Sequence, residues 1–182
     1  MPSQIPNALA IKLASDPKWI LKRFDELTTL ELFSILKLRQ NVFMLEQASL
    51  YPDIDGADLT ALHLFLVSDQ DDAEAETQTP LPILAYGRIL APVQIESDRF
   101  TSAKRISFGR VIIAKEARGT GLGTALIDQL METIKMRFPD VSQIEIGAQA
   151  HLENFYGKFG FVKATEPYDD GGVLHIDMHC RL

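Results

Sequence analysis

The sequence predicts one α/β (α+β) domain built around a mixed β-sheet. Segments with helical and with strand periodicity alternate along the chain, and the strands show both alternating and continuous apolar patterns. A chain of 182 residues that is 46% hydrophobic can bury one core of ordinary size. We therefore expect a single domain over residues 18–182, after a poorly defined segment at residues 1–17 and with an acidic surface loop at residues 68–82.

The first half of the chain predicts one long helix among strands. Strand-like runs occupy residues 18–24, 63–68, 83–90 and 105–114. A helix is expected over residues 28–47, where a threonine at position 28 or 29 can cap the first turn. Its apolar positions recur at helical spacing: Leu32, Ile35, Leu36, Val42 and Phe43.

The second half predicts two further helices and two strands. A helix after the glycine cluster has one broad apolar face and ends near Pro139. That face carries Leu122, Leu126, Leu130 and Ile134 at every fourth position, with Ile127 and Met131 beside them. A strand at residues 142–150 and a short helix at residues 152–161 follow, and residues 173–182 alternate strictly between apolar and polar side chains, as a half-buried strand does.

Composition narrows the classes of protein and of partner. The net charge of −7 argues against a general nucleic-acid binder and mildly favours cationic partners. The single cysteine, Cys180, allows no intrachain disulfide and fits a reducing compartment. No long apolar segment or export-like leader occurs, so we expect neither a membrane span nor a signal peptide, and a cytoplasmic location. The oligomeric state stays open between a monomer and a homodimer.

The stretch "RGTGLGT" at residues 118–124 is the first candidate binding site. A glycine-rich turn between a strand and a helix exposes backbone N–H groups at the positive end of the helix dipole, which suits an anion. The alternative is a tight turn that holds no ligand. A phosphate-binding P-loop is disfavoured because no lysine follows the glycines, and the dinucleotide pattern G-x-G-x-x-G is incomplete.

The spacing R-x-x-G-x-G, made by Arg118, Gly121 and Gly123, resembles the pyrophosphate loop of the GCN5-related N-acetyltransferases (GNAT). Asn154 and Tyr156, ahead of a Gly-Phe pair, resemble the C-terminal half of that superfamily. The motifs L-R-x-x-V-F-x-x-E-Q from residue 38 and Y-x-D-x-D-G-x-D from residue 51 resemble the ElaA-type acetyltransferases. The likeness spans roughly residues 24–178, interrupted by the acidic loop.

The resemblance implies a mostly antiparallel, twisted sheet flanked by helices and splayed at its central strands. It also implies acetyl-CoA as the acyl donor, with its pyrophosphate on the glycine loop, its pantetheine along one strand, and a backbone N–H polarising the thioester. Tyr156 becomes the acid for the departing thiolate, although that proton transfer is uphill by roughly 2 kcal/mol at ordinary pKa values. The expected acetyl-CoA-binding residues are Val111, Ile112, Ile113, Arg118, Gly119, Thr120, Gly121, Leu122, Gly123, Thr124, Asn154 and Tyr156.

The acceptor amine needs a base, because a primary amine near pKa 10.4 is almost wholly protonated at pH 7. Spacing does not single out one among Glu46, Asp55, His63 and His151. His151 ranks first since it follows a strand end beside the expected thioester, so the expected catalytic set is Tyr156, His151 and Glu46. Substrate-binding residues are expected on the first helix and the loop after it, namely Arg39, Glu46 and Asp55, and at the start of the next strand, namely His63.

The carboxylates of this segment, at positions 46, 53, 55 and 58, are expected to attract a cationic amine. The alternative is that they form ion pairs or shape a turn. We expect no metal: the calcium-loop order is incomplete around Gly56, and His175 and His179 would stand about 13 Å apart on a strand. Competing functions are a non-catalytic acyl-CoA sensor and an acyltransferase for a longer acyl-CoA.

Overall fold

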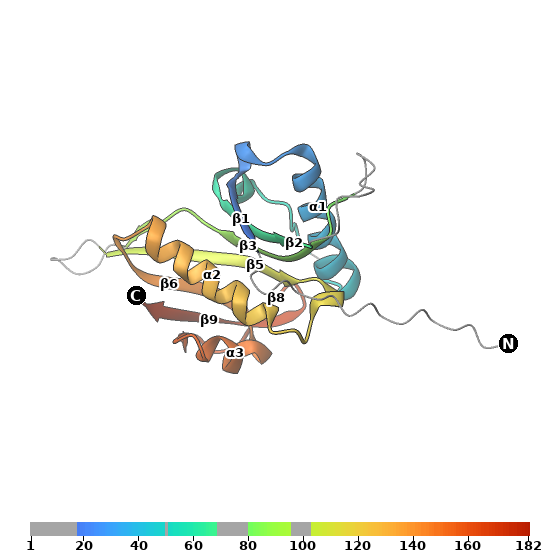
Figure 1. Cartoon of the computed structure of the whole chain (residues 1–182). Coiled ribbons are helices and arrows are strands. Elements are labelled where there is room, and N and C mark those ends of the chain that lie inside the picture. Colours follow the sequence, from blue (N-terminus) through green and yellow to red (C-terminus); the bar gives the residue numbers. More distant parts are fainter. Residues whose placement is uncertain (1–17, 50, 69–79, 96–102) are drawn as a thin grey trace.

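The computed structural model describes residues 18–49, 51–68, 80–95 and 103–182, and these form a mixed α/β structure around one twisted sheet (Figure 1). Among these residues the sheet has nine strands, whose main path runs β1-β2-β3-β5-β6-β9-β7, with β4 paired to β5 and β8 paired to β9. All pairs are antiparallel except β5 with β6. The predicted fold class is confirmed.

The strands are β1 (Trp19–Arg23), β2 (Leu62–Val67), β3 (Ile83–Ile89), β4 (Val93–Ile95), β5 (Ala103–Ile113), β6 (Val141–Gln149), β7 (Val162–Lys163), β8 (Tyr168–Asp170) and β9 (Val173–Arg181). The helices are α1 (Thr29–Arg39), α2 (Leu122–Arg137) and α3 (Glu153–Gly157). The sequence patterns missed the short strands β4, β7 and β8. Residues 1–17 and most of the predicted acidic loop, residues 69–79, lie outside the described residues.

The first helix begins as predicted and then changes its winding. Thr28 caps α1: its side chain accepts from the Glu31 N–H, and the Glu31 carboxylate accepts from the Thr28 N–H in return. After Arg39 the chain continues as a π-helical stretch, η2 (Gln40–Glu46). Such wide turns are rare and frequently occur at functional sites.

Two apolar clusters cover the two faces of the sheet. The buried face of α2 packs with Leu64 and Leu66 of β2 on one face, and α3 lies on that same face (Figure 1). Ile35 of α1 packs with Phe65 of β2 on the other. Five of the six apolar positions predicted for this face of α2 are buried, since Leu122, Leu126, Leu130, Ile134 and Ile127 are at most 2% exposed. Met131, the sixth, is only partly buried against the same cluster.

The central strands part from one another halfway along. β5 and β6 pair in parallel only as far as Ser107 and Glu145. Beyond that point β5 stays with β3, reaching Ile113, while β6 stays with β9, reaching Gln149. The facing edges of β5 and β6 therefore diverge, and beyond this point their backbone groups do not pair with each other.

A β-bulge in β5 accompanies this divergence. The register between β3 and β5 shifts, so that two residues, Arg110 and Val111, stand opposite Gly87. Arg110 adopts a left-handed conformation with φ of 53°, which costs a non-glycine residue on the order of 1–3 kcal/mol. The bulge reverses the side-chain parity of the strand. Phe108 packs with the α2 cluster, whereas Ile112 packs with the α1 cluster.

Candidate active site

The glycine loop leads directly into α2, and its glycines leave the backbone uncovered by side chains. Gly119 and Gly121 have φ of 77° and 86°, values that favour glycine, and a Cβ on either would meet nothing within 4 Å. Gly121 is the N-cap of α2 and supplies no side-chain hydrogen bond to its first turn. The loop thus leaves open space at the positive end of a helix whose first N–H groups have no side-chain cap, which fits a phosphate group.

Arg118, at the start of this loop, is bound to Glu46. Its Nη2 donates to Glu46 Oε2 at 3.0 Å, its Nη1 donates to the other carboxylate oxygen, and its Nε donates to the Ile113 carbonyl at 3.1 Å. These bonds from Arg118 hold the pKa of Glu46 below its usual value. Glu46 is thereby engaged with the expected donor loop and does not line the cavity described next, which argues against its expected roles as base and as acceptor contact.

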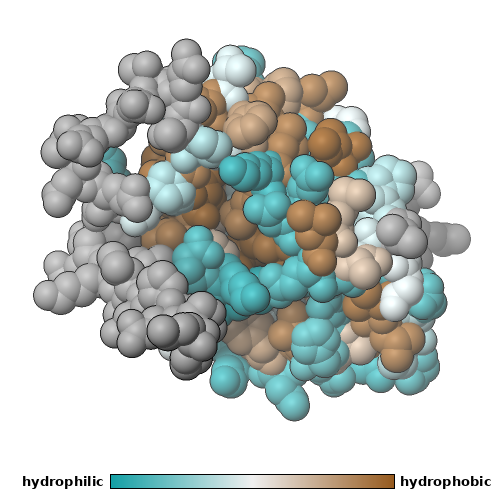
Figure 2. Space-filling view, turned by 90° about the vertical axis from the view of Figure 1, so that its right-hand side faces the viewer, coloured by the Kyte–Doolittle hydropathy of each residue, from teal (hydrophilic) through white to brown (hydrophobic). Residues whose placement is uncertain are grey.

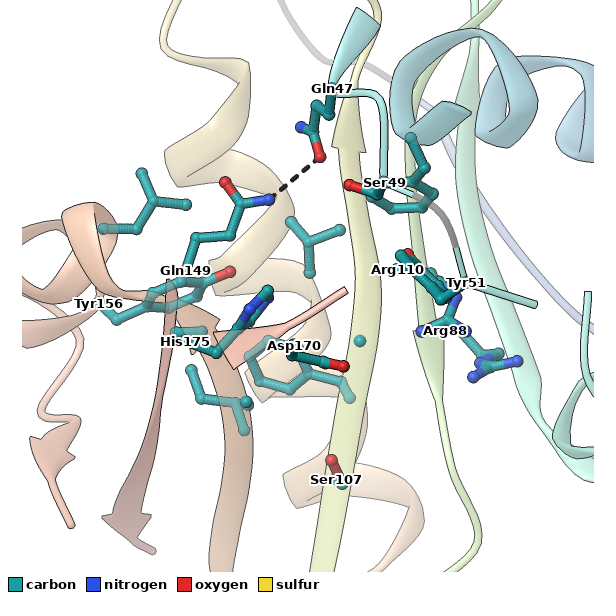
Figure 3. A pocket seen from close by; sticks show the side chains of 18 of the residues that line it. Gln47, Ser49, Tyr51, Arg88, Ser107, Arg110, Gln149, Tyr156, Asp170 and His175 are labelled. Carbon is teal, nitrogen blue, oxygen red and sulfur yellow. Dashed lines mark hydrogen bonds between the residues drawn. The ribbon is translucent and has the colours of Figure 1, made fainter. Parts of the chain in front are cut away.

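A cavity of about 400 Å³ fills the divergence between β5 and β6. One wall comes from the first half of the chain and from β3 and β5, and includes Phe43, Gln47, Ser49, Tyr51, Arg88 and residues 107–111. The other comes from β6, α3, β8 and β9, and includes residues 146–149, Leu152, Tyr156, Asp170 and His175. Figure 3 shows the labelled side chains from both walls converging, with Gln149 Nε2 donating across to Gln47 Oε1 at 3.1 Å.

Figure 2 shows that the molecular surface mixes hydrophobic side chains, drawn in brown, with hydrophilic ones in teal. Brown side chains lie deep between the hydrophilic ones near the centre of this face, so the surface is hollowed there. No described helix has the length and apolar character that crossing a membrane requires. Within the described ranges, no group of three or more His, Cys, Asp or Glu side chains is placed to hold a metal ion.

Tyr156 is the expected catalytic residue that the fold brings to the cavity. It lies on α3 with 6% of its surface exposed and packs edge-to-face against Phe155 and Phe161. Burial raises the pKa of Tyr156 to about 12, so the phenol stays protonated throughout the working range of most enzymes. Among the expected donor-binding residues of β5, Val111 also lines the cavity, while Ile112 is 2% exposed in the α1 cluster.

The two remaining candidates on this side lie elsewhere. Asn154 is exposed on α3 and His151 is exposed just before it, and neither lines the cavity. Asn154 does not cap α3 either, because Leu152 holds that position. The histidine that does line the cavity is His175 on β9, whose Nδ1 lies 2.9 Å from the Val173 carbonyl oxygen.

The acidic segment after α1 is neutralised by three arginines. Arg39, fully buried, donates to Asp53 at 2.9 Å and to Asp58 at 2.8 Å. Arg88 donates to Asp55 at 2.6 Å and to Asp58 at 2.7 Å. Burial raises the pKa of Asp58, but the hydrogen bonds from its two arginines outweigh that effect and leave it below its usual value.

These contacts correct the picture of an acidic acceptor wall. Arg39 is part of a buried ion network and cannot reach a substrate, and Asp55 turns its oxygens toward arginines. His63 is also fully buried: its Nε2 donates to the Asp58 carbonyl at 3.0 Å, and its Nδ1 accepts from the Tyr86 hydroxyl at 2.9 Å. Burial lowers the pKa of His63, which has no access to solvent or to the cavity.

The sequence patterns missed the cavity residues Arg88, Arg110, Asp170 and His175. The alternation of the last strand did separate His175 from the apolar face, and that was a usable signal. Nothing local marked Arg110, because the side-chain parity of β5 changes at its bulge, and Arg88 on β3 was read only as part of a strand.

Comparison with known proteins agrees with this geometry. The model of the acetyltransferase (GNAT) domain family matches residues 75–182, more than half of the chain. The chain therefore belongs to the GNAT acetyltransferase domain family, and the resemblance inferred from its motifs is confirmed.

Its relatives include ElaA of Escherichia coli, 36% identical over 161 residues that cover 88% of this chain and 94% of that protein. A UPF0039 protein of Synechocystis is 36% identical over 165 residues, covering 90% and 95%. Among solved structures, an acyl-CoA N-acyltransferase from Pseudomonas aeruginosa has a TM-score of 0.73 and 34% identity, and ElaA of Escherichia coli has 0.72 and 35%. Each comparison covers 91% of this chain and 99% of the other.

Proposed function

We propose that this protein transfers an acetyl group from acetyl-CoA to a primary amine by direct attack of the amine on the thioester. The observation that carries the proposal is the cavity between the diverging strands β5 and β6, which holds Tyr156 and the bulged edge of β5. A bulge leaves backbone groups unpaired. Beyond Ser107 the edge of β5 that faces β6 has no paired strand, so its backbone groups are free to bind the pantetheine and to polarise the thioester carbonyl.

The donor's phosphates are assigned to the glycine loop. Gly119 and Gly121 leave open space where side chains would stand, and the first turn of α2 has no side-chain cap. The loop also lies beside β5, since a Cβ on Gly123 would come within 3.9 Å of Ile113. A single CoA molecule can therefore run from the loop along β5 toward Tyr156.

His175 replaces His151 as the proposed base. A carbonyl oxygen can only accept, so His175 Nδ1 carries the proton in its contact with Val173, and the neutral ring leaves Nε2 as an acceptor. Nε2 takes a proton from the ammonium form of the acceptor, directly or through water. The amine nitrogen then bonds to the carbonyl carbon and the C–S bond breaks, while Tyr156 donates a hydrogen bond to the departing thiolate. The second proton of the attacking nitrogen leaves through solvent and ends on that thiolate, which gives the amide and the CoA thiol.

The test is CoA thiol release from acetyl-CoA with polyamines, amino acids, amino sugars and basic peptides, with the acetylated product identified by mass spectrometry. Turnover with an amine supports the proposal. CoA binding without turnover of any amine supports the sensor alternative instead. Faster turnover with propionyl- or butyryl-CoA than with acetyl-CoA would show that the acyl donor is a longer acyl-CoA.

A further inference from the structure

The cavity wall formed by β3 and β5 carries two arginines. Arg88 and Arg110 line it, and the carboxylates that neutralise them do not. Asp53, Asp55 and Asp58 approach the two guanidinium groups from outside the cavity lining. Arg88 uses both of its Nη atoms on Asp55 and Asp58 and is 4% exposed, so Arg110, with a side chain that is 20% exposed, is the arginine that an acceptor in the cavity can meet.

Arg110 keeps one donor for a ligand. Its Nε lies 2.7 Å from Asp53 Oδ1, and its Nη2 donates at 3.2 Å to the Asp53 carbonyl and to Asp55 Oδ2. Nη1 has no hydrogen-bond partner among the described residues, and the side chain is 20% exposed. The guanidinium carbon stands 5.1 Å from the centre of the Tyr51 ring, which restricts the orientation of the fork.

The bulge explains why Arg110 is available at this point. Regular alternation from Phe108 would direct the side chain of residue 110 to the α2 face. The left-handed conformation at φ of 53° instead brings it to the α1 side of the sheet, beside Asp53. Backbone strain of this kind persists only where the surroundings enforce it, and it gathers at functional sites.

The opposite wall carries the complementary groups. Asp170 on β8 is the carboxylate among the described residues that line the cavity, and His175 on the paired strand β9 lines it too (Figure 3). The β8–β9 hairpin also reaches the first wall, because a Cβ on Gly171 would stand 3.4 Å from Tyr51. The cavity thus has the partly exposed Arg110 guanidinium on one side and a carboxylate and a histidine on the other.

We propose that the acceptor is a small amine that also bears a carboxylate, such as a free amino acid. Its carboxylate accepts from Arg110 Nη1, and its amine lies toward Asp170 and His175. A polyamine fits less well, because its second ammonium group would face the guanidinium group of Arg110. The inference rests on the proposed acetyl transfer and adds to it the chemical class of the substrate.

The experiment compares matched acceptors with the wild-type protein: lysine with cadaverine, phenylalanine with phenethylamine, and each amino acid with its amide. A charged hydrogen bond to the carboxylate should raise kcat/KM for the amino acid roughly 10-fold or more over its partners. Equal or better turnover of the decarboxylated amines would overturn the inference while leaving the proposed acetyl transfer intact. Acetylation of no amine at all would remove the proposed function and this inference together.

The variant Arg110→Lys keeps the charge and loses the fork, so the preference for the carboxylate-bearing member of each pair should fall toward 1. Arg105→Lys is the matched control. Arg105 lies on the same strand, and its guanidinium donates to Glu145 at the surface, outside this cavity. An unchanged preference in a folded Arg110→Lys protein overturns the assignment of the carboxylate to Arg110. Should that variant fail to fold, the wild-type comparison of matched acceptors still decides the class.

Discussion

The role of the Tyr156 hydroxyl can be tested through the variant Tyr156→Phe. With the pKa of Tyr156 raised to about 12 by burial, giving its proton completely to a thiolate of pKa near 8.5 is uphill by about 5 kcal/mol. A hydrogen bond to the developing thiolate needs no such transfer and contributes roughly 1.5–3 kcal/mol. We therefore expect kcat to fall roughly 10- to 150-fold, with little change in acetyl-CoA affinity.

The pH dependence separates the two roles. A donor with a pKa of about 12 stays protonated below that pH, so the wild-type rate should rise as the acceptor amine loses its proton and should not fall again before about pH 10. The assay is initial-rate thiol release at saturating acetyl-CoA, across pH 6 to about 10. Tyr168→Phe is the matched control, because that hydroxyl bonds Asp177 outside the cavity. A wild-type decline with an apparent pKa near 8.5, abolished in Tyr156→Phe, would refute this reasoning.

Three further predictions concern the donor loop and the ion pairs. Gly121→Ala should weaken CoA binding in calorimetry far more than Gly172→Ala, because both glycines have φ of 86° and open space at Cβ but only Gly121 lies in the proposed phosphate site; equal effects would misplace that site. Asp58→Asn should lower the free energy of unfolding, measured in urea, by about 3–5 kcal/mol, because it removes one charge from a buried ion network. Glu46→Gln breaks an exposed ion pair and should lower that free energy by less than about 1 kcal/mol. Similar losses in the two variants would contradict this ranking. Hydrogen bonding from Arg88 lowers the pKa of Asp55 in the folded protein. The ionised Asp55 therefore stabilises the fold fully above its unfolded-state pKa of 3.8, and this stabilisation is lost as the pH falls through the folded-state pKa. In Asp55→Asn the melting temperature should depend less on pH below 3.8 than in wild type.

Sequence patterns predicted the features that arise from neighbours along the chain. The threonine cap, the four-residue spacing of α2 and the alternation of β9 each depend on contacts within one element and its nearest partner, so periodicity reports them directly. The glycine loop belongs to the same group, because positive φ angles at Gly119 and Gly121 are a local requirement that only glycine meets easily. Tyr156 was found through a motif that includes the turn after its helix.

The acceptor side of the site depended on the tertiary structure. Arg39 finds its aspartates 14 and 19 residues away, and Arg110 finds Asp53 57 residues away, distances over which no periodicity carries information. The bulge in β5 decides which way Arg110 points. The pairing of β9 with β6 brings His175 to the cavity, whereas His151 is exposed just after β6 ends. Sequence alone was therefore sufficient for the fold class and the family, and it supplied the donor loop as a hypothesis. The charge of the acceptor wall was decided by pairing across the sheet, because a carboxylate attracts a ligand only where no guanidinium has already taken its oxygens.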